Sequence, residues 1–242
     1  MTKEIHTPVL LVAGHWLGAW AWDDVLSHLR AAGIRPTALT LPGLDDADPD
    51  RLQRTLEDQT RAIADALTHL DAPAVIVAHS GANAPVTLVL DRYPELVQRV
   101  IWVDSGPIGD GSVFAPDLPL TQRELPLPPF ERLAQQASLA GLTPGILDEF
   151  RARALSEPAG VLTAPASLRN PARHGVPTTM VCCSISSAQV RGLLSAGHPM
   201  FAAVGEVTDA EWVDLPTGHW PMWSRPRELA EIITAASLRR NG

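Results

Sequence analysis

Short apolar runs alternate with amphipathic stretches through the first half of the chain. The runs at residues 9–13, 75–78 and 100–103 are wholly apolar and strongly β-forming, and residues 35–41 form a further strand candidate that ends at Pro42-Gly43. Continuous apolar runs of this length are typical of strands that are buried on both faces of a parallel sheet. Their alternation with helical patterns therefore predicts an α/β fold with helices on both faces of the sheet.

Helices are expected between these strands. The pattern predicts them at residues 18–32, from an Asp50 cap to about residue 71, and at residues 81–93, where Pro94 ends the helix. The second half of the chain predicts strands at 178–183 and 211–215, a helical segment at 188–204 and a last helix at 224–238. The sum is about six parallel strands in one domain.

The alternation fails between residues 107 and 177. This stretch is rich in proline and contains only two helical patches, at 130–139 and 146–155. A segment of this length between two sheet strands is more often a functional lid than a structureless loop. We therefore expect a core formed by residues 1–106 and 178–242, with residues 107–177 inserted as a cap after the fourth strand.

A serine lies at the corner between the 75–78 strand and the helix that follows. The corner reads Ala78-His79-Ser80-Gly81-Ala82, with small residues two positions to either side of the serine. Small neighbours allow the sharp strand-to-helix turn that exposes a nucleophilic hydroxyl. Alanine replaces glycine at both flanking positions, and an ordinary helix start is the alternative interpretation.

A histidine loop follows the last predicted strand. It reads Thr217-Gly218-His219-Trp220-Pro221. The carboxyl ends of parallel strands share one rim of the sheet, so His219 is expected on the same side as Ser80. The chain order also matches a Ser-acid-His triad, whereas the alternative is a loop histidine that is hydrogen-bonded for structural reasons.

Charge and composition narrow the possible partners. The chain of 242 residues has a formal net charge of −8, which argues against nucleic acid or an anionic membrane as a partner. Lys3 is the sole lysine, so Schiff-base and P-loop chemistry are not expected. Neither a signal-peptide pattern nor an apolar run of roughly 20 residues is present, and we expect a cytoplasmic protein.

No cofactor or metal is expected. The eight histidines lack metal-ligand spacing, and no glycine-rich dinucleotide motif occurs. Cys182 and Cys183 are adjacent in a predicted strand, so their side chains should point to opposite faces and no disulfide should join them. The acidic loop with Asp45, Asp46 and Asp48 is expected to be a solvated connection.

Residues 9–22, 78–83 and 218–226 together resemble the α/β-hydrolase fold. Within it, the chain is similar to a branch that contains plant methylesterases, hydroxynitrile lyases and bacterial esterase-like proteins. The resemblance implies that Ser80 is the nucleophile and His219 the base. It also implies that the backbone N–H groups of Gly81 and His15 form the oxyanion hole.

The chain departs from this family at the triad acid. The acid usually follows the strand that spans residues 178–183 here, but residues 183–187 contain no carboxylate. Asp104 ends the neighbouring strand on the same rim, where some α/β-hydrolases place the acid, and could hold the productive tautomer of His219. Turn capping by Asp104, an acid role for Asp214, and a Ser-His dyad supported by Ser186 remain as alternatives.

A second departure occurs in the oxyanion loop, which reads Ala13-Gly14-His15 where the family commonly has His-Gly and a small residue. The His15 side chain is expected either to enter the pocket or to pack against Trp16 or Trp20. Trp16, Trp220 and Trp223, together with apolar residues of the cap, predict an aromatic pocket for a small hydrophobic substrate.

The leading hypothesis is a serine hydrolase that cleaves a carboxylic ester or lactone with a hydrophobic part, through an acyl-enzyme at Ser80. A non-hydrolytic lyase or cyclase on the same fold is the first alternative. A ligand-binding member with weak or no catalysis is the second, because the usual acid is missing. The sequence does not predict an oligomeric state.

Overall fold

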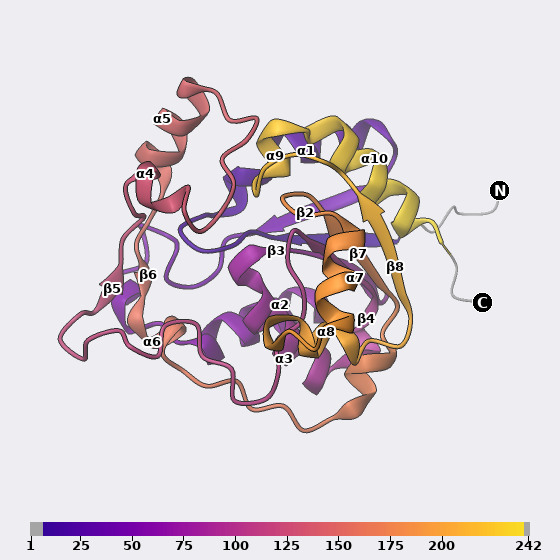
Figure 1. Cartoon of the computed structure of the whole chain (residues 1–242), viewed down its shortest axis with the longest axis horizontal. Coiled ribbons are helices and arrows are strands. Elements are labelled where there is room, and N and C mark those ends of the chain that lie inside the picture. The colour runs from indigo at the N-terminus through magenta and orange to yellow at the C-terminus, as the bar shows by residue number, and fades with distance from the viewer. Residues whose placement is uncertain (1–6, 240–242) are drawn as a thin grey trace.

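The computed structural model describes residues 7–239 of the chain. Residues 1–6 and 240–242, which include Lys3, lie outside the described part. A six-stranded, all-parallel sheet forms the centre of the molecule, with the strand order β2-β1-β3-β4-β7-β8 (Figure 1). In that order the strands are Arg35–Leu39, Pro8–Val12, Ala74–His79, Val97–Val103, Thr178–Cys182 and Ala210–Asp214.

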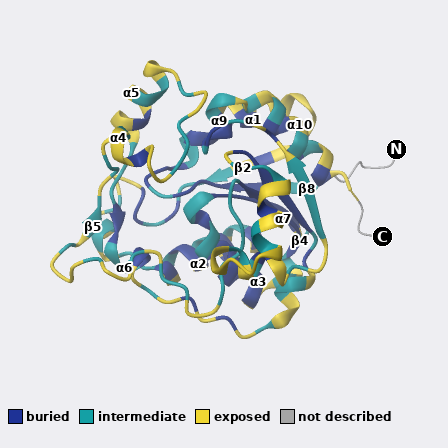
Figure 2. Ribbon diagram, in the orientation of Figure 1, coloured by how far each residue is buried: buried dark blue, intermediate teal, exposed yellow. Residues whose placement is uncertain are grey.

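Helices cover both faces of the sheet, as the sequence predicts. On one face lie α1 (Asp23–Ala31), α9 (Pro221–Ser224) and α10 (Pro226–Ser237). The other face carries α2 (Leu56–Thr68), α3 (Asn83–Arg92), α7 (Ser187–Ser195) and α8 (Ala202–Gly205). Strand β3 is buried at every position because both of its faces are covered (Figure 2).

Residues 107–177, here called the insert, lie between β4 and β7 in the sequence. Most of the insert gathers at the carboxyl ends of the strands, and its last part returns past α3 to the start of β7 (Figure 1). The insert contains few regular elements, and two of them, β5 and β6, pair as a short antiparallel ribbon. Its elements are β5 (Glu124–Leu125), α4 (Phe130–Leu133), α5 (Pro144–Arg153), β6 (Glu157–Pro158) and α6 (Ala159–Leu162), followed by the 3₁₀ helix η5 (Pro171–Gly175).

The expected cap of α2 at Asp50 is wrong. Asp50 precedes a separate 3₁₀ turn, η2 (Arg51–Gln53), and its side chain makes no capping hydrogen bond there. Thr55 caps α2 instead, because its hydroxyl accepts from Asp58 N–H while the Asp58 carboxylate accepts from Thr55 N–H. This reciprocal pair satisfies two helix-end donors at once, so the helix starts there.

Several helix limits also differ from the pattern. The segment at 188–204 is not one helix: α7 ends at Ser195, and Gly197 (φ +70°) separates it from η6 (Pro199–Phe201), which begins with a proline and leads into α8. A glycine in the left-handed region followed by proline terminates a helix. The 18–32 helix is likewise divided, into η1 (Ala19–Trp22) and α1, and the 130–139 helix is limited to α4.

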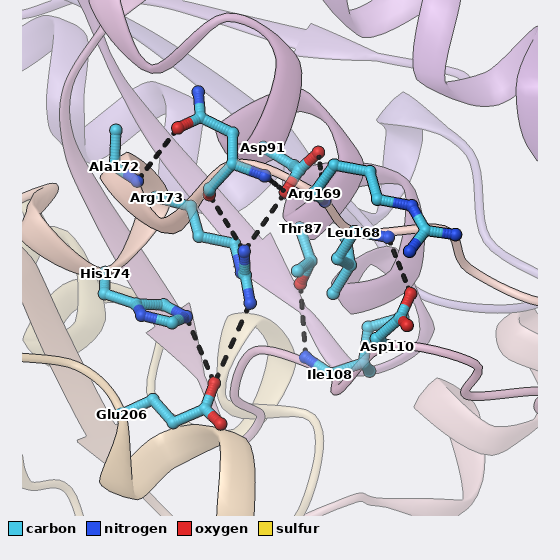
Figure 3. Close-up of polar contacts among 11 residues, drawn as sticks. Thr87, Asp91, Ile108, Asp110, Leu168, Arg169, Ala172, Arg173, His174 and Glu206 are labelled. Carbon is cyan, nitrogen blue, oxygen red and sulfur yellow. Dashed lines mark hydrogen bonds and ion pairs between the residues drawn. The ribbon is translucent and has the colours of Figure 1, made fainter.

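A buried carboxylate ties the end of the insert to the core (Figure 3). Asp91, on α3, is 5% exposed and accepts hydrogen bonds from the backbone N–H groups of Arg169 and Asn170 and from the Arg173 side chain. Such charge-assisted bonds are the strong class of hydrogen bond in proteins. They hold the returning chain against α3 before it enters β7.

Candidate active site

Ser80 occupies the sharp corner between β3 and α3. Its backbone lies in the left-handed region (φ +50°), and it begins a single 3₁₀ turn, η3 (Ser80–Ala82), that continues into α3. Ala78 and Ala82, the small residues on either side, are completely buried. Larger side chains there would press on the flanking strand and helix, which accounts for the relaxed small-x-Ser-x-small motif.

Three residues other than glycine have a positive φ within residues 7–239, and all three belong to this site. They are Trp16 (φ +67°), Ser80 and Asp104 (φ +45°). A side chain in this region costs of order 1–3 kcal/mol and persists only where the surrounding structure enforces it. The strain is therefore concentrated in the oxyanion loop, the serine corner and the end of β4.

The structure brings Ser80, His219 and Asp104 together in one hydrogen-bonded chain. His219 Nε2 lies 2.8 Å from Ser80 Oγ, and His219 Nδ1 lies 2.6 Å from Asp104 Oδ2. The Asp104 side chain is 5% exposed and that of His219 16%. The arrangement has the geometry of a Ser-His-Asp triad, in which the carboxylate orients the imidazole and the imidazole accepts the serine proton.

The loop after β7, which lacks the usual acid, holds Asp104 in place. The N–H groups of Cys183 and Ser184 donate to Asp104 Oδ1 at 3.0 and 2.9 Å, and the Ser184 hydroxyl donates to Oδ2 at 2.7 Å. Burial acts to raise the pKa of Asp104. The hydrogen bond and charge of His219 and the hydrogen bonds from Ser184 outweigh burial, and the pKa of Asp104 lies below its ordinary value.

The other acid candidates have different structural roles. Asp214, at the end of β8, accepts from the N–H and hydroxyl of Ser187 at the start of α7. Ser186 caps the same helix in a reciprocal pair with Gln189. The contacts to His219 Nδ1 and Nε2 come from Asp104 and Ser80, and neither Asp214 nor Ser186 shares them.

The oxyanion loop packs tightly on the serine corner. A Cβ at Gly14 would lie 2.7 Å from Ser80 Cβ and 2.9 Å from Gly81 N, so only glycine allows this approach. In the described residues 7–239, the N–H groups of His15 and Gly81 donate to no side chain or loop carbonyl. Free backbone donors beside the nucleophile are the requirement of an oxyanion hole.

The His15 ring packs rather than lining the cavity. It lies against Gly81, where an added Cβ would come within 2.3 Å of His15 Cδ2. Its other neighbours are Phe114, at 4.2 Å between ring centroids, and Trp16, at 5.9 Å. Packing against Trp16 agrees with one sequence expectation, but Trp20 instead stacks on Trp223 at 5.6 Å.

A cavity of about 780 Å³ opens at Ser80 and lies between the insert and the region of α7 and α8. Side chains from the insert form one wall, and apolar side chains around β7, α7 and α8 form the other. The lining includes Asn83, Phe114, Gln135, Ser138, Leu139, Met180, Cys182, Ile185, Val190, Met200, Phe201, Val204 and Trp212. The size and the mixed lining suit a small organic molecule.

The expectation that Trp16, Trp220 and Trp223 form an aromatic pocket is wrong, because none of the three lines this cavity. Trp16 is buried and its Nε1 donates to Leu125 O. Trp220 and Trp223 pack on Phe150 of α5, with ring centroids at 5.5 and 5.0 Å. The apolar surfaces of these tryptophans are buried in the contact between the insert and the core, and so they do not line the cavity.

Residues 7–239 contain no group of three or more His, Cys, Asp or Glu side chains that could hold a metal ion. Cys182 and Cys183 are both free and belong to the cores on opposite faces of the sheet, as expected. Burial raises the pKa of Cys182 to about 11 and also raises that of Cys183, so both remain thiols.

Three polar residues of the site were not predicted from the sequence. They are Ser184, which holds Asp104, and the buried pair Gln59 and Glu157, which contacts the oxyanion loop. A lone serine or glutamine has no distinctive sequence signal. Glu157 was detectable only as a charged residue inside an otherwise apolar part of the insert.

Searched over residues 7–239, the fold has no helix long and apolar enough to cross a membrane.

The chain belongs to the alpha/beta hydrolase family, because the model of that family matches residues 9–232. Esterase PIR7B of Oryza sativa subsp. japonica is 37% identical over 99 residues, which cover 39% of this chain and 37% of that protein. Methylesterase 4 of Arabidopsis thaliana is 28% identical over 146 residues, which cover 58% of this chain and 51% of that protein. The matched regions thus span about a third to a half of these relatives.

Solved structures agree on the fold. An extracellular alpha/beta-hydrolase from a Paenibacillus species, described as sharing structural and functional homology with tobacco salicylic acid binding protein 2, superposes with a TM-score of 0.78. The match covers 96% of this chain and 100% of that one at 19% sequence identity. At this identity the similarity establishes the sheet and its helices, and the family resemblance seen in the sequence is confirmed.

His79, beside the nucleophile, supports the histidine loop from behind. Its Nε2 donates to the backbone carbonyl of His219 at 2.8 Å, while its Nδ1 has no partner in the described structure. Complete burial lowers the pKa of His79 to about 3, and the proximity of His219 adds to the effect. His79 is therefore neutral in the folded protein at any pH at which the enzyme would work.

This burial predicts acid sensitivity. Below pH 6.5, the unfolded chain takes up a proton at His79 and the folded protein does not, so stability should fall as pH decreases from 6.5 towards about 3. His79→Gln keeps an N–H donor for the His219 carbonyl and should flatten this decrease, measured as the free energy of urea unfolding at several pH values. His28→Gln, at an exposed histidine of α1, should leave the slope as in the wild type.

Proposed function

We propose that the protein is a cofactor-independent serine hydrolase that cleaves a carboxylic ester or lactone with a hydrophobic part. The observation that carries this proposal is the hydrogen-bonded chain from Asp104 through His219 to Ser80 at the wall of a large cavity. The names of the curated relatives, which include esterases and methylesterases, support ester hydrolysis as the general class of reaction.

In the proposed first step, Ser80 Oγ attacks the ester carbonyl carbon while His219 Nε2 accepts the hydroxyl proton. The carbonyl π electrons move onto oxygen, and the negative charge is stabilised by the N–H groups of Gly81 and His15. When the tetrahedral intermediate collapses, the bond to the alcohol oxygen breaks and His219 returns the proton to that oxygen. A donor of this kind contributes about 3 kcal/mol to the stability of the transition state.

In the proposed second step, a water molecule replaces the alcohol. His219 accepts a proton from the water as its oxygen attacks the acyl carbon, and the proton then passes to Ser80 Oγ as the acyl bond to the serine breaks. The products are a carboxylic acid and the regenerated serine. Asp104 stays ionised throughout and stabilises the imidazolium that forms in each step, which agrees with the lowered pKa of Asp104.

The cavity lining supports an uncharged substrate. Among residues 7–239, the lining contains no lysine or arginine, and its titratable groups are Asp104, His219 and the Cys182 thiol. A free carboxylate or phosphate on the substrate would therefore be desolvated without a cationic partner. The apolar wall formed by Val190, Phe201 and Val204 fits an acyl or alcohol part of several carbons.

The contact between Asp104 and His219 favours hydrolysis over the binding-protein alternative, which rested on the missing acid. No specific observation favours a lyase or cyclase.

We further propose that the insert is a lid over the cavity. The cytoplasmic location stays a prediction, since one structural neighbour is an extracellular protein.

Ser80 is expected to be the site of covalent labelling. A fluorophosphonate should modify the purified protein at the peptide that contains Ser80, as measured by mass spectrometry, and Ser80→Ala should abolish the adduct. Ser138→Ala, which alters another serine of the cavity wall, should leave labelling intact. Absence of the adduct, or its persistence in Ser80→Ala, would contradict a serine hydrolase.

Asp104→Asn should lower kcat by about four orders of magnitude, because the amide favours the wrong tautomer of His219. The steady-state rate of ester hydrolysis measures the effect. Asp214→Asn is the matched control. Asp214 ends β8, two strands away from β4, and its carboxylate accepts from the N–H and hydroxyl of Ser187 at the start of α7, so the variant should retain activity within a few-fold. A loss of less than tenfold in Asp104→Asn would exclude Asp104 as the acid.

Val204→Phe should shorten the apolar side of the cavity. The kcat/KM for p-nitrophenyl esters of eight to twelve carbons should fall by about tenfold or more, because part of their apolar surface can no longer be buried. The value for p-nitrophenyl acetate in the same variant should stay within threefold, which serves as the internal control. Equal losses for short and long esters would exclude this wall as the binding surface.

A further inference from the structure

Glu157, on β6 of the insert, is a buried carboxylate beside the proposed oxyanion loop. The residue is 1% exposed. Its Oε1 accepts from Gln59 Nε2 of α2 at 2.9 Å. Its Oε2 faces His15 Nδ1 at 3.1 Å and the Trp16 N–H at 3.4 Å. Among residues 7–239, the His15 ring is the only basic side chain within 4 Å of the Glu157 carboxylate.

A buried carboxylate such as that of Glu157 requires hydrogen-bond donors around it. It must accept hydrogen bonds to offset the loss of water, so the donors around it are held where the carboxylate needs them. Two of the three donors belong to consecutive residues of one loop, His15 and Trp16. Gln59 fixes the opposite oxygen, because the same amide nitrogen also donates to Pro42 O at 3.2 Å. The carboxylate therefore has one permitted orientation.

The insert holds the same loop at two further points. Trp16 Nε1 donates to Leu125 O at 3.0 Å, and Leu155 N–H donates to Trp16 O at 3.1 Å. Trp16 is one of the residues with a positive φ, and such a conformation persists only under external constraint. The contacts from β5, β6 and the chain between α5 and β6 supply that constraint.

The His15 ring transmits the position of Glu157 to the serine corner. Its face lies against Gly81, and Phe114 covers it on the cavity side. With Nδ1 held by Glu157, the ring cannot turn away from Gly81. The two proposed oxyanion donors, the N–H groups of His15 and Gly81, belong to the residues that this contact brings together.

We propose that Glu157 is a positioning residue for the oxyanion hole: acting through His15 and Trp16, it makes the geometry of the two backbone donors depend on the seating of the insert. The inference rests on the serine-hydrolase function proposed above. Substrate contact is not part of the role, because Glu157 lies outside the cavity lining. Its effect is on the transition state, where the oxyanion carries full charge.

The test is Glu157→Gln, with kcat and KM measured on p-nitrophenyl butyrate and the rate of fluorophosphonate labelling measured separately. The amide keeps the shape but repels one of the N–H donors. We expect kcat and the labelling rate to fall together by about 10- to 100-fold, the effect of displacing rather than removing a donor, while KM stays within threefold. A purely structural role would not separate kcat from KM.

Asp91→Asn is the matched control. Asp91 is also a buried carboxylate that accepts backbone N–H groups at the junction of insert and core, but it lies on α3 and contacts residues 169–173 (Figure 3). The Asp91→Asn variant should have a lower melting temperature than the wild type and a kcat within twofold of the wild-type value. If Glu157→Gln behaves in the same way, with stability lost and kcat retained, the positioning role is overturned.

His15→Ala is the second variant, which decides the question if Glu157→Gln does not fold. It keeps the backbone N–H and removes the ring that Glu157 holds, and should reproduce the loss of kcat at nearly constant KM. An unchanged kcat in His15→Ala would overturn the inference. A wild-type protein that is neither active nor labelled would overturn the proposed function with it, whereas a labelled wild type with unaffected variants overturns the positioning role alone.

Discussion

The site depends on one buried charge, the carboxylate of Asp104. It lies at the end of β4 in a left-handed conformation, and the loop after β7 surrounds it with three donors. These bonds extend the contact between the two strands beyond their last ladder pair, so the same interaction that closes this part of the sheet also orients His219. Any displacement of β7 relative to β4 would be transmitted directly to the imidazole.

Close packing explains why strain is tolerated on this rim. At position 14 only glycine can approach the serine corner this closely, because a Cβ would clash with Ser80. Gly81 likewise leaves room for the His15 ring. Three strained backbones would together cost several kcal/mol, which the completely buried strand β3 and the seam of tryptophans around Phe150 offset through apolar burial. The strained residues are therefore held by contacts with other parts of the fold and not by the loops that contain them.

The sheet and the triad geometry could be anticipated because both follow from short-range rules. Apolar runs mark buried parallel strands, and such strands bring Ser80, Asp104 and His219 to one rim. The remaining features depend on tertiary contacts. The roles of Trp220 and Trp223 were decided by Phe150 of the insert, the break before α8 by Gly197 and Pro199, and the partners of Glu157 by residues far away in sequence. Periodicity carries no information about such pairings.

Glu157 and Asp91 join the insert to the core at two separated places, each through a charge buried away from water. Lifting the whole insert would expose both carboxylates and break every hydrogen bond that they accept. A rigid-body opening of the insert therefore has a high free-energy cost. Phe114 and Met200 line the cavity yet are 56% and 75% exposed, so they stand at its boundary with solvent. These two apolar side chains therefore form the boundary between cavity and solvent while the insert stays seated and both charges stay buried.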